Sequence, residues 1–322
     1  MSEPATIRVL DPGVLTTVQD LGRPGWSAIG VSRGGAADAL SLRVGNRLVG
    51  NVDGAAALEM TLVGGTFEFL RDASIVLAGA MTAARIESNS GERFAPAWAP
   101  FDMRMGQRLR VGPIRGGVRV YLCVAGGIAV PDVLGSLSTH LAGGFGGLAG
   151  RALRAGDELV VGRDAGPRAD AATAGRAQRL CETPLARRTL RAVHGAHADA
   201  FDADAVAAFW STTFEVSMQS DRAGLRLCGR IGSSPHGGRM QSEGMMPGAV
   251  QVPESGAPIV LLVDHPTTGG YPVIACVAAV DLPVLGQLAP ARRLRFERVS
   301  RGEARALHAE QERRLNEEVP PR

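Results

Sequence analysis

Lysine is absent from this sequence of 322 residues, and its 35 basic side chains other than histidine are all arginines. Without lysine the chain has no phosphate-loop lysine for a nucleotide, no amine for a Schiff base and no attachment point for biotin. If ATP or carboxybiotin takes part in the function, arginines or a partner protein must supply the positive charge.

Disulfide and metal-binding patterns are also missing. The four cysteines include no Cys-x-x-Cys pair, and Cys123 and Cys276 lie in apolar, strand-like runs. This pattern predicts buried free thiols in a reducing compartment. His194 and His197 are three residues apart, but no third ligand follows at a typical metal-binding spacing, so we expect no metal site.

The composition also argues against membrane spans and nucleic-acid contacts. No apolar run approaches the roughly 20 residues that cross a bilayer, and the N-terminus has no apolar signal segment. The net charge is only +3, aromatic residues make up 4% of the chain, and basic and aromatic residues are not interleaved. We therefore expect a cytoplasmic protein that binds neither membranes nor nucleic acids.

Glycine and proline are abundant, with 42 and 19 residues, which favours short strands joined by turns. Apolar runs or alternation predict strands that include 7–10, 118–125 and 259–263. An apolar face predicts a helix over 36–49, and a polar helix is expected over 300–314. The predicted fold class is mostly β, with two β-rich lobes, a few short helices and a C-terminal helix.

The second half of the chain repeats features of the first in the same order. The matching positions are Asp38 with Asp221, Glu59 with Glu243, Cys123 with Cys276, and the segment 75–77 with 259–261. The repeat predicts a first lobe over 5–165, a linker over 166–184, a second lobe over 185–300 and a helical tail over 301–322. Chance similarity between two strand-rich segments is the alternative. Related lobes commonly enclose a cleft, where the paired acids would meet.

The stretch 242–271 is the strongest candidate for a functional site. An apolar strand leads directly into a loop that carries Asp264, His265, Thr267, Thr268, Gly269, Gly270 and Tyr271. The glycines allow backbone N–H groups to approach an anion, and the threonines add hydroxyl donors. The alternatives are a polar turn between strands and, for His265, a purely structural role.

Two acids and two arginines complete the candidate site. Glu243 precedes the loop, and Asp38 is the other acid; crowded carboxylates raise one another's pKa, which suits acid–base catalysis. Arg23 and Arg33 flank glycines and would contact an anionic group. The alternatives are that Asp38 caps a helix and that both arginines are surface charges.

Six segments together resemble a known family. They read TTVQDLGRPGW, GVSRGGAADALSLRVGNRLVGN, LEMTLVGG, SDRAGLRLCG, SEGMMPGAVQVP and DHPTTGGYPVI, in consistent order between residues 7 and 296. On these motifs the chain is identified as a member of the allophanate hydrolase subunit 2, or biotin-dependent carboxyltransferase, family. That family includes the C subunit of 5-oxoprolinase and an antagonist of a sporulation-kinase inhibitor.

The resemblance implies two cyclophilin-like β-barrel lobes and a B-subunit partner of the kinase-inhibitor, or allophanate hydrolase subunit 1, type. With a LamB-type A subunit, such an enzyme uses ATP and magnesium to open a small cyclic amide, 5-oxoproline, to glutamate. The ATP site is then shared with the partner or supplied by it. Two alternatives stay open: a regulatory antagonist that binds the B subunit without turnover, and the carboxyltransferase component of a urea-carboxylase-like enzyme whose biotin another chain carries.

If the chain is such a C-type component, the resemblance also suggests roles for individual residues. The substrate or a phosphorylated intermediate would contact Asp264, Thr267, Thr268 and Gly269, while the acid–base or orienting groups would be Glu243 and Asp38. The sequence departs from the family pattern, which has arginine where His265 stands, glutamine at Pro266 and serine at Gly35. To replace that arginine as a cation, His265 would have to be protonated near neutral pH.

Overall fold

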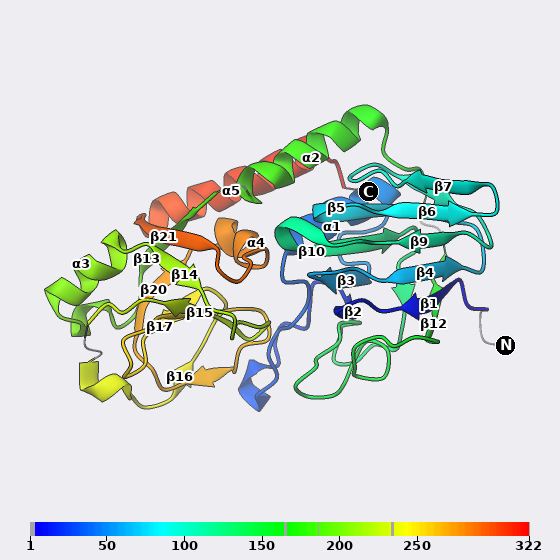
Figure 1. Cartoon of the computed structure of the whole chain (residues 1–322). Coiled ribbons are helices and arrows are strands. Elements are labelled where there is room, and N and C mark those ends of the chain that lie inside the picture. Colours follow the sequence, from blue (N-terminus) through cyan, green and yellow to red (C-terminus); the bar gives the residue numbers. More distant parts are fainter. Residues whose placement is uncertain (1–3, 164–165, 186, 233–234, 322) are drawn as a thin grey trace. The chain divides into compact units, whose positions relative to one another are not determined.

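The chain divides into two compact units (Figure 1). The structure is a computed structural model that describes residues 4–163, 166–185, 187–232 and 235–321. Unit 1 comprises Met1–Arg23, Gly34–Leu185 and Arg314–Arg322, and unit 2 comprises Pro24–Arg33 and Ala186–Arg313.

Unit 1 is built from two antiparallel sheets and two helices. Its elements are β1 (Ile7–Asp11), β2 (Leu15–Gln19), α1 (Ala39–Val49), β3 (Ala57–Thr61), β4 (Thr66–Phe69), β5 (Ala73–Thr82), β6 (Arg85–Ser88), β7 (Gly91–Phe94), β8 (Phe101–Met103), β9 (Arg108–Arg110), β10 (Ile114–Val124), β11 (Ile128–Ala129), β12 (Glu158–Val161) and α2 (Ala171–Leu185). One sheet has the order β11-β12-β1-β4-β9-β6-β7, and the other has the order β2-β3-β10-β5-β8.

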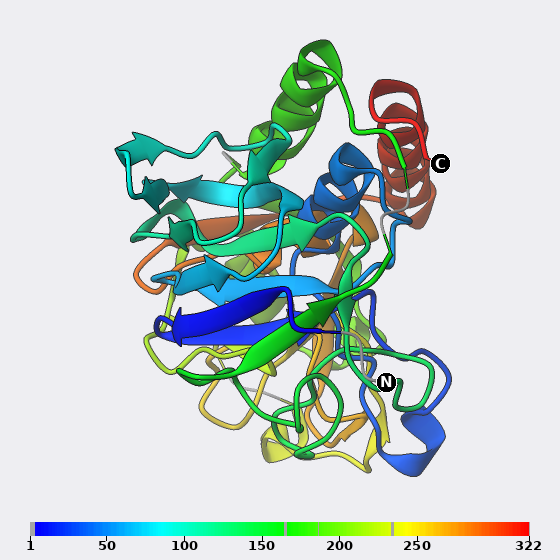
Figure 2. The same ribbon diagram turned by 90° about the vertical axis from the view of Figure 1, so that its right-hand side faces the viewer.

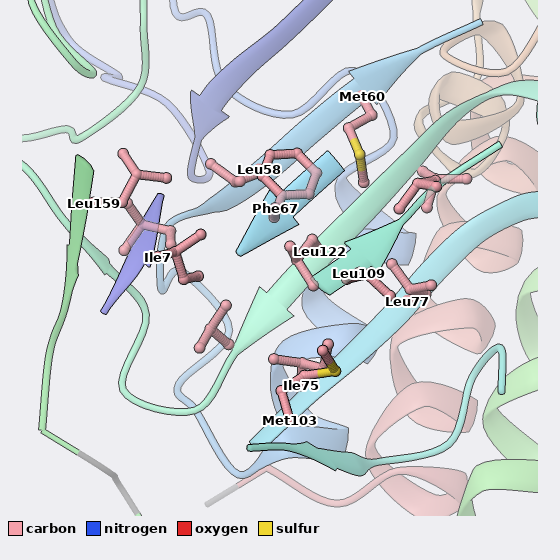
Figure 3. Close-up of a cluster of buried hydrophobic side chains, with 14 of the residues drawn as sticks. Ile7, Leu58, Met60, Phe67, Ile75, Leu77, Met103, Leu109, Leu122 and Leu159 are labelled. Atoms are coloured by element: carbon pink, nitrogen blue, oxygen red, sulfur yellow. The ribbon is translucent and has the colours of Figure 1, made fainter. Parts of the chain in front are cut away.

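The five-stranded sheet is buried on both faces. Along β10, Val120 and Leu122 point into the core shared with the seven-stranded sheet, whereas Tyr121 and Cys123 point into the core beneath the helices. Figure 3 shows the first of these cores, with Leu122 beside side chains from both sheets. A strand that is covered on both faces favours apolar residues on both, and this explains the apolar run at 120–125; Arg119, just before it, is buried in an ion pair with Glu59.

Helix α1 covers one face of that sheet (Figure 2). It begins after Asp38, whose carboxylate accepts a hydrogen bond from the Ser41 N–H, and it ends at Gly50, which has a φ of 82°. Gly45 faces the sheet so closely that a Cβ there would lie 2.7 Å from the Cys123 Sγ. The glycine therefore allows the helix and the sheet to approach each other.

Unit 2 contains a closed barrel of seven strands. Its elements are η1 (Ser27–Ile29), β13 (Thr189–His194), η2 (Ala198–Ala200), α3 (Ala203–Ser211), β14 (Phe214–Val216), β15 (Gly224–Cys228), η3 (Pro235–Gly238), β16 (Glu243–Gly244), β17 (Ala249–Gln251), β18 (Ile259–Leu261), β19 (Thr268–Gly269), β20 (Val273–Val277), η4 (Ala279–Asp281), α4 (Leu282–Leu285), β21 (Arg293–Arg298) and α5 (Arg301–Glu318), whose last residues belong to unit 1. The barrel order is β13-β20-β17-β18-β15-β14-β21, and β16 and β19 form a separate two-stranded ribbon.

The mostly β prediction is confirmed, and so are helices close to 36–49 and 300–314. The segment 166–184, expected to be a linker, contains most of α2, which belongs to unit 1. The lobe boundary expected at residue 165 lies outside the described residues, and so does the last residue of the expected helical tail. The predicted bounds of the two lobes, 5–165 and 185–300, therefore remain a prediction.

The residue-by-residue repeat is not reproduced. Cys123 on β10 is fully buried and lies opposite Val76 on β5. Cys276 on β20 is only partly buried, and β20 pairs with β13 and β17 rather than with β18, the counterpart of β5 in the predicted repeat. Any central strand selects the same small set of apolar residues, so similar motifs arise at positions that are not equivalent.

All four cysteines are free, but the prediction of buried thiols holds for only two of them. Cys123 and Cys181 are buried, whereas Cys276 is partly exposed and Cys228 is exposed. Burial raises the pKa of the Cys123 and Cys181 thiols. These two side chains act as small apolar groups in the core of unit 1.

Candidate functional site

The loop after β18 is tied to the segment that carries Glu243. Strands β16 and β19 are antiparallel, with Glu243 opposite Gly269 and Gly244 opposite Thr268. Backbone hydrogen bonds on either side extend this ribbon, from Met245 N–H to the Thr267 carbonyl and from Met240 N–H to the Gly270 carbonyl. The structure therefore brings together the two parts of the stretch 242–271.

Glu243 lies next to His197, which the sequence had suggested only as a possible metal ligand. The His197 Nε2 lies 3.4 Å from a Glu243 carboxylate oxygen. The Val273 N–H donates to His197 Nδ1 at 3.1 Å, and the His197 N–H donates to the Val273 carbonyl, also at 3.1 Å. Because Nδ1 accepts a hydrogen bond, the ring hydrogen lies on Nε2, and at 3.4 Å its contact with Glu243 is longer than a normal hydrogen bond. No local sequence signal links these residues.

Asp264 is held by a buried arginine rather than exposed to a ligand. Arg222 donates from Nε to one carboxylate oxygen at 2.7 Å and from Nη2 to the other at 3.2 Å. The two side chains are only 7% and 9% exposed. A bidentate pair of this kind neutralises the Asp264 charge and fixes the start of the loop. In the structure Asp264 is therefore a positioning residue.

His265 does not act as a substitute cation. Its side chain is buried, and Nδ1 lies 2.7 Å from the Pro266 carbonyl oxygen, to which it donates a hydrogen bond. Burial lowers the pKa of His265 below its ordinary value of 6.5. Burial therefore opposes the charged form of the ring, which argues against the expectation that His265 replaces an arginine charge.

The rest of the loop divides into a buried part and an exposed part. Thr267 is buried, whereas Thr268 is exposed and Tyr271 is 41% exposed. A Cβ at Gly269 would lie 2.4 Å from the Gln251 Nε2, and one at Gly270 would lie 3.0 Å from the Met240 carbonyl oxygen. The glycines thus serve close packing within unit 2, and the exposed polar surface includes Thr268, Tyr271 and Glu243.

Asp38 belongs to a different, fully buried network in unit 1. Its carboxylate accepts hydrogen bonds from the Ser41 N–H at 2.9 Å and the Ser41 hydroxyl at 2.6 Å, so the helix-cap alternative is confirmed. The Asp38 N–H donates to the Tyr121 hydroxyl, which in turn donates to Glu59. Arg119 also pairs with Glu59, at 3.2 Å. Burial raises the pKa of the Tyr121 hydroxyl well above its usual range.

The acids that the repeat paired therefore lie in unlike surroundings. Asp38 and Glu59 are each 1% exposed, whereas the Glu243 side chain is 51% exposed. Asp221 lies in a turn, where it accepts hydrogen bonds from the N–H groups of Ala223 and Gly224. These local environments do not support a shared acid–base role for the four acids that the repeat paired.

The two candidate arginines also differ from each other. Arg23 is 1% exposed; it donates to the Val133 and Ser138 carbonyls, and its guanidinium lies 5.0 Å from the centre of the Phe145 ring. It therefore fixes the glycine-rich segment around Phe145 and is not a surface charge. Arg33 is exposed and belongs to unit 2.

Gly35 explains one departure from the family pattern. Its φ is +88°, and a Cβ at this position would lie 2.6 Å from the Gly22 backbone nitrogen. A serine does not fit there without a backbone shift, because both the conformation and the space require glycine.

Neither a metal cluster nor a membrane span is found in the part of the chain that the structure describes. No group of three or more His, Cys, Asp or Glu side chains there is placed to hold a metal ion. Every helix in that part is too short or too polar to cross a lipid bilayer.

Comparison with known proteins relates this chain to a protein family. The profile of the family described as "Carboxyltransferase domain, subdomain A and B" matches residues 29–298. The C subunit of 5-oxoprolinase from Escherichia coli strain K12 is 40% identical over 309 residues, which are 95% of this chain and 96% of that protein. The protein of the same name from Haemophilus influenzae is 36% identical over 95% of both chains.

Solved structures lead to the same family. The crystal structure of the Kluyveromyces lactis urea amidolyase superimposes with a TM-score of 0.88 and 30% identity over 99% of this chain. Our chain spans only 20% of that larger protein, so it matches one part of it. Over most of its length, the chain therefore belongs to the carboxyltransferase domain family, subdomains A and B.

Proposed function

We propose that this chain is the C subunit of a multi-component, ATP-dependent 5-oxoprolinase, which opens the cyclic amide of 5-oxoproline to glutamate. One observation carries the proposal: the 40% identity to the corresponding Escherichia coli 5-oxoprolinase component extends over 96% of that protein. The urea amidolyases of Lachancea kluyveri and Saccharomyces cerevisiae are 32% and 31% identical, and the match covers only 18% and 17% of them.

In this proposal the exposed polar face of the β16–β19 ribbon contacts the substrate. Thr268 and Tyr271 offer hydroxyl groups, and Glu243 is the acid–base group that His197 orients. Asp264 and its partner Arg222 position the loop from within unit 2. The positive charge for ATP and magnesium comes from arginines of this chain or from a partner, because the chain contains no lysine.

The test is reconstitution with the subunits encoded beside this chain. The purified chain is mixed with its B subunit and with a LamB-type A subunit, and ATP consumption is measured together with glutamate release from 5-oxoproline. Urea and other small amides serve as competing substrates. Glutamate release that depends on ATP and on all the subunits supports the proposal. A complete assembly that hydrolyses urea but not 5-oxoproline contradicts it.

A carboxyltransferase component of a biotin enzyme is the second candidate. The TM-score of 0.88 with the Kluyveromyces lactis urea amidolyase over 99% of this chain supports it. Without lysine this chain cannot itself carry biotin, so a biotin carrier protein must deliver the carboxyl group. Transfer of labelled carboxylate from such a carrier to urea would favour this candidate over the first.

A further inference from the structure

Unit 2 contains a polar cavity that shares no residue with the loop after β18. Its volume is about 580 Å³. It is lined by the end of β13 and the turn that follows, by the end of β21, and by the first turn of α5. Neither Glu243 nor residues 264–271 contribute to it.

Two arginines in this cavity have no ion-pair partner. Among the residues that the structure describes, the guanidinium groups of Arg298 and Arg301 form no salt bridge and no side-chain hydrogen bond, and both residues are exposed. The nearby Glu303 carboxylate is already engaged, because it accepts a hydrogen bond from the Ser300 N–H at 2.7 Å. Asp199 is the other acid of the lining.

A histidine in the same lining also lacks a partner for one nitrogen. The Nε2 of His194 is buried and has no hydrogen-bond partner within the described ranges. The ring is held by Trp210, with the two ring centres 5.6 Å apart. A buried imidazole nitrogen without a partner is costly, so the described part of the chain by itself leaves one polar group of this lining unsatisfied.

The start of α5 is a third feature of this cavity that favours the binding of an anion. Ser300 caps this helix, because its hydroxyl accepts a hydrogen bond from the Glu303 N–H at 3.1 Å. The first N–H groups of a helix have no partner inside it, and they give that end a partial positive charge. The guanidinium groups and this helix end thus favour an anion in the same cavity.

We propose that this cavity binds a small oxyanion, either a phosphate group or a carboxylate. Arg298 and Arg301 would each donate two hydrogen bonds to anionic oxygens. Asp199 on the rim would then favour a ligand that also carries an ammonium group, such as an acidic amino acid. The binding site is independent of the proposed function, because it requires neither ATP nor the partner proteins.

The test is a calorimetric titration of the full chain, alone, with three probes: inorganic phosphate, L-glutamate and succinate. The double variant Arg298→Gln/Arg301→Gln should bind at least about tenfold more weakly than the wild type, because charged hydrogen bonds are lost. The matched control is Arg295→Gln, which also replaces an exposed arginine on β21 but lies outside the cavity. Imidazole NMR signals of His194 should shift during the titration.

The three probes distinguish the possible ligands. Binding of phosphate alone identifies a phosphate group, and tighter binding of glutamate than of succinate identifies an amino acid whose ammonium group Asp199 recognises. The proposal is overturned if no probe binds at millimolar concentration, or if the control weakens binding as much as the double variant does. Binding that leaves the His194 signals unchanged would place the anion elsewhere and overturn the proposal as well.

Discussion

At the scale of single residues, neighbouring backbone groups decide what the two histidines of unit 2 do. At His197, Nδ1 accepts the Val273 N–H, so the ring hydrogen lies on Nε2, which is 3.4 Å from a Glu243 carboxylate oxygen. At His265, Nδ1 donates to the Pro266 carbonyl, and burial lowers the pKa of the ring. His197 therefore lies beside an exposed carboxylate, whereas His265 is a buried part of the loop whose charged form is disfavoured.

Replacing His197 tests its role as a positioning residue for Glu243. In the reconstituted enzyme, His197→Ala should lower kcat about tenfold, as expected if the polar contact with the Glu243 carboxylate contributes about 1.4 kcal/mol, while KM changes little. His197→Gln keeps both a donor and an acceptor and should retain most of the activity. Equal losses in the two variants, with unchanged thermal unfolding, would contradict this role.

Asp264→Asn tests whether the loop depends on its ion pair. The substitution removes the carboxylate that neutralises the buried Arg222 guanidinium, and we expect the free energy of unfolding to fall by about 3–5 kcal/mol. Urea unfolding measures this change. The control is Glu158→Gln, whose ion pair with Arg8 has side chains 47% and 42% exposed and should change stability far less. Similar losses in both variants would refute the structural role.

His265 should make stability depend on pH in a defined direction. Its pKa is lower in the folded chain than its ordinary value of 6.5, so the unfolded chain binds the proton more readily. The neutral ring is fully compatible with folding above about pH 6.5, and stability is lost as the pH falls below that value. The wild type should therefore lose more stability than His265→Gln between about pH 7.5 and pH 5 in urea unfolding. A constant difference between the two proteins would contradict the burial effect.

At the scale of elements, the five-stranded sheet of unit 1 is organised by the close approach of α1. One face of β5 and β10 meets the other sheet, and the opposite face meets α1 and the core that includes Cys181 of α2. The buried network of Glu59, Arg119 and Tyr121 lies on this helical side and binds the N–H groups at the start of α1. Helix and sheet are thus joined by hydrogen bonds at one end and by a glycine contact along their length.

Gly45→Ala tests that contact. A methyl group there would lie 2.7 Å from the Cys123 Sγ and 2.8 Å from the Ala78 Cβ, so the helix must move away from the sheet. We expect a loss of about 1–3 kcal/mol in the free energy of unfolding, despite the higher helix propensity of alanine. The control is Gly302→Ala in α5, where the nearest atom is 3.8 Å away and no loss is expected. A neutral or stabilising effect of Gly45→Ala would show that stability does not depend on the close packing of α1 against the sheet.

At the scale of the whole molecule, the chain matches nearly the full length of a 5-oxoprolinase component but lacks the residue type that most often holds nucleotide phosphates. It aligns with 96% of the C subunit of the Escherichia coli enzyme and contains no lysine. The activity that we propose is therefore expected to require other subunits, which supply or complete the nucleotide site.

ATP hydrolysis by the isolated chain tests this dependence. We expect no turnover above the buffer background with or without 5-oxoproline, and turnover only after the B subunit is added. When increasing amounts of the B subunit are added to a fixed amount of this chain, the rate of ATP hydrolysis should rise to a plateau. Robust hydrolysis by the chain alone, abolished by a substitution within it, would contradict the prediction.

Local sequence patterns predict the mostly β class, the helix that begins after Asp38 and the polar loop after β18. Each of these follows from residues close together in the chain, through apolar periodicity, capping and turn chemistry. The pairing of Arg222 with Asp264, the position of His197 beside Glu243 and the burial of Arg23 depend instead on the folded chain. These partners are distant in sequence, and burial and charge pairing depend on which strands become neighbours, so local patterns cannot encode them.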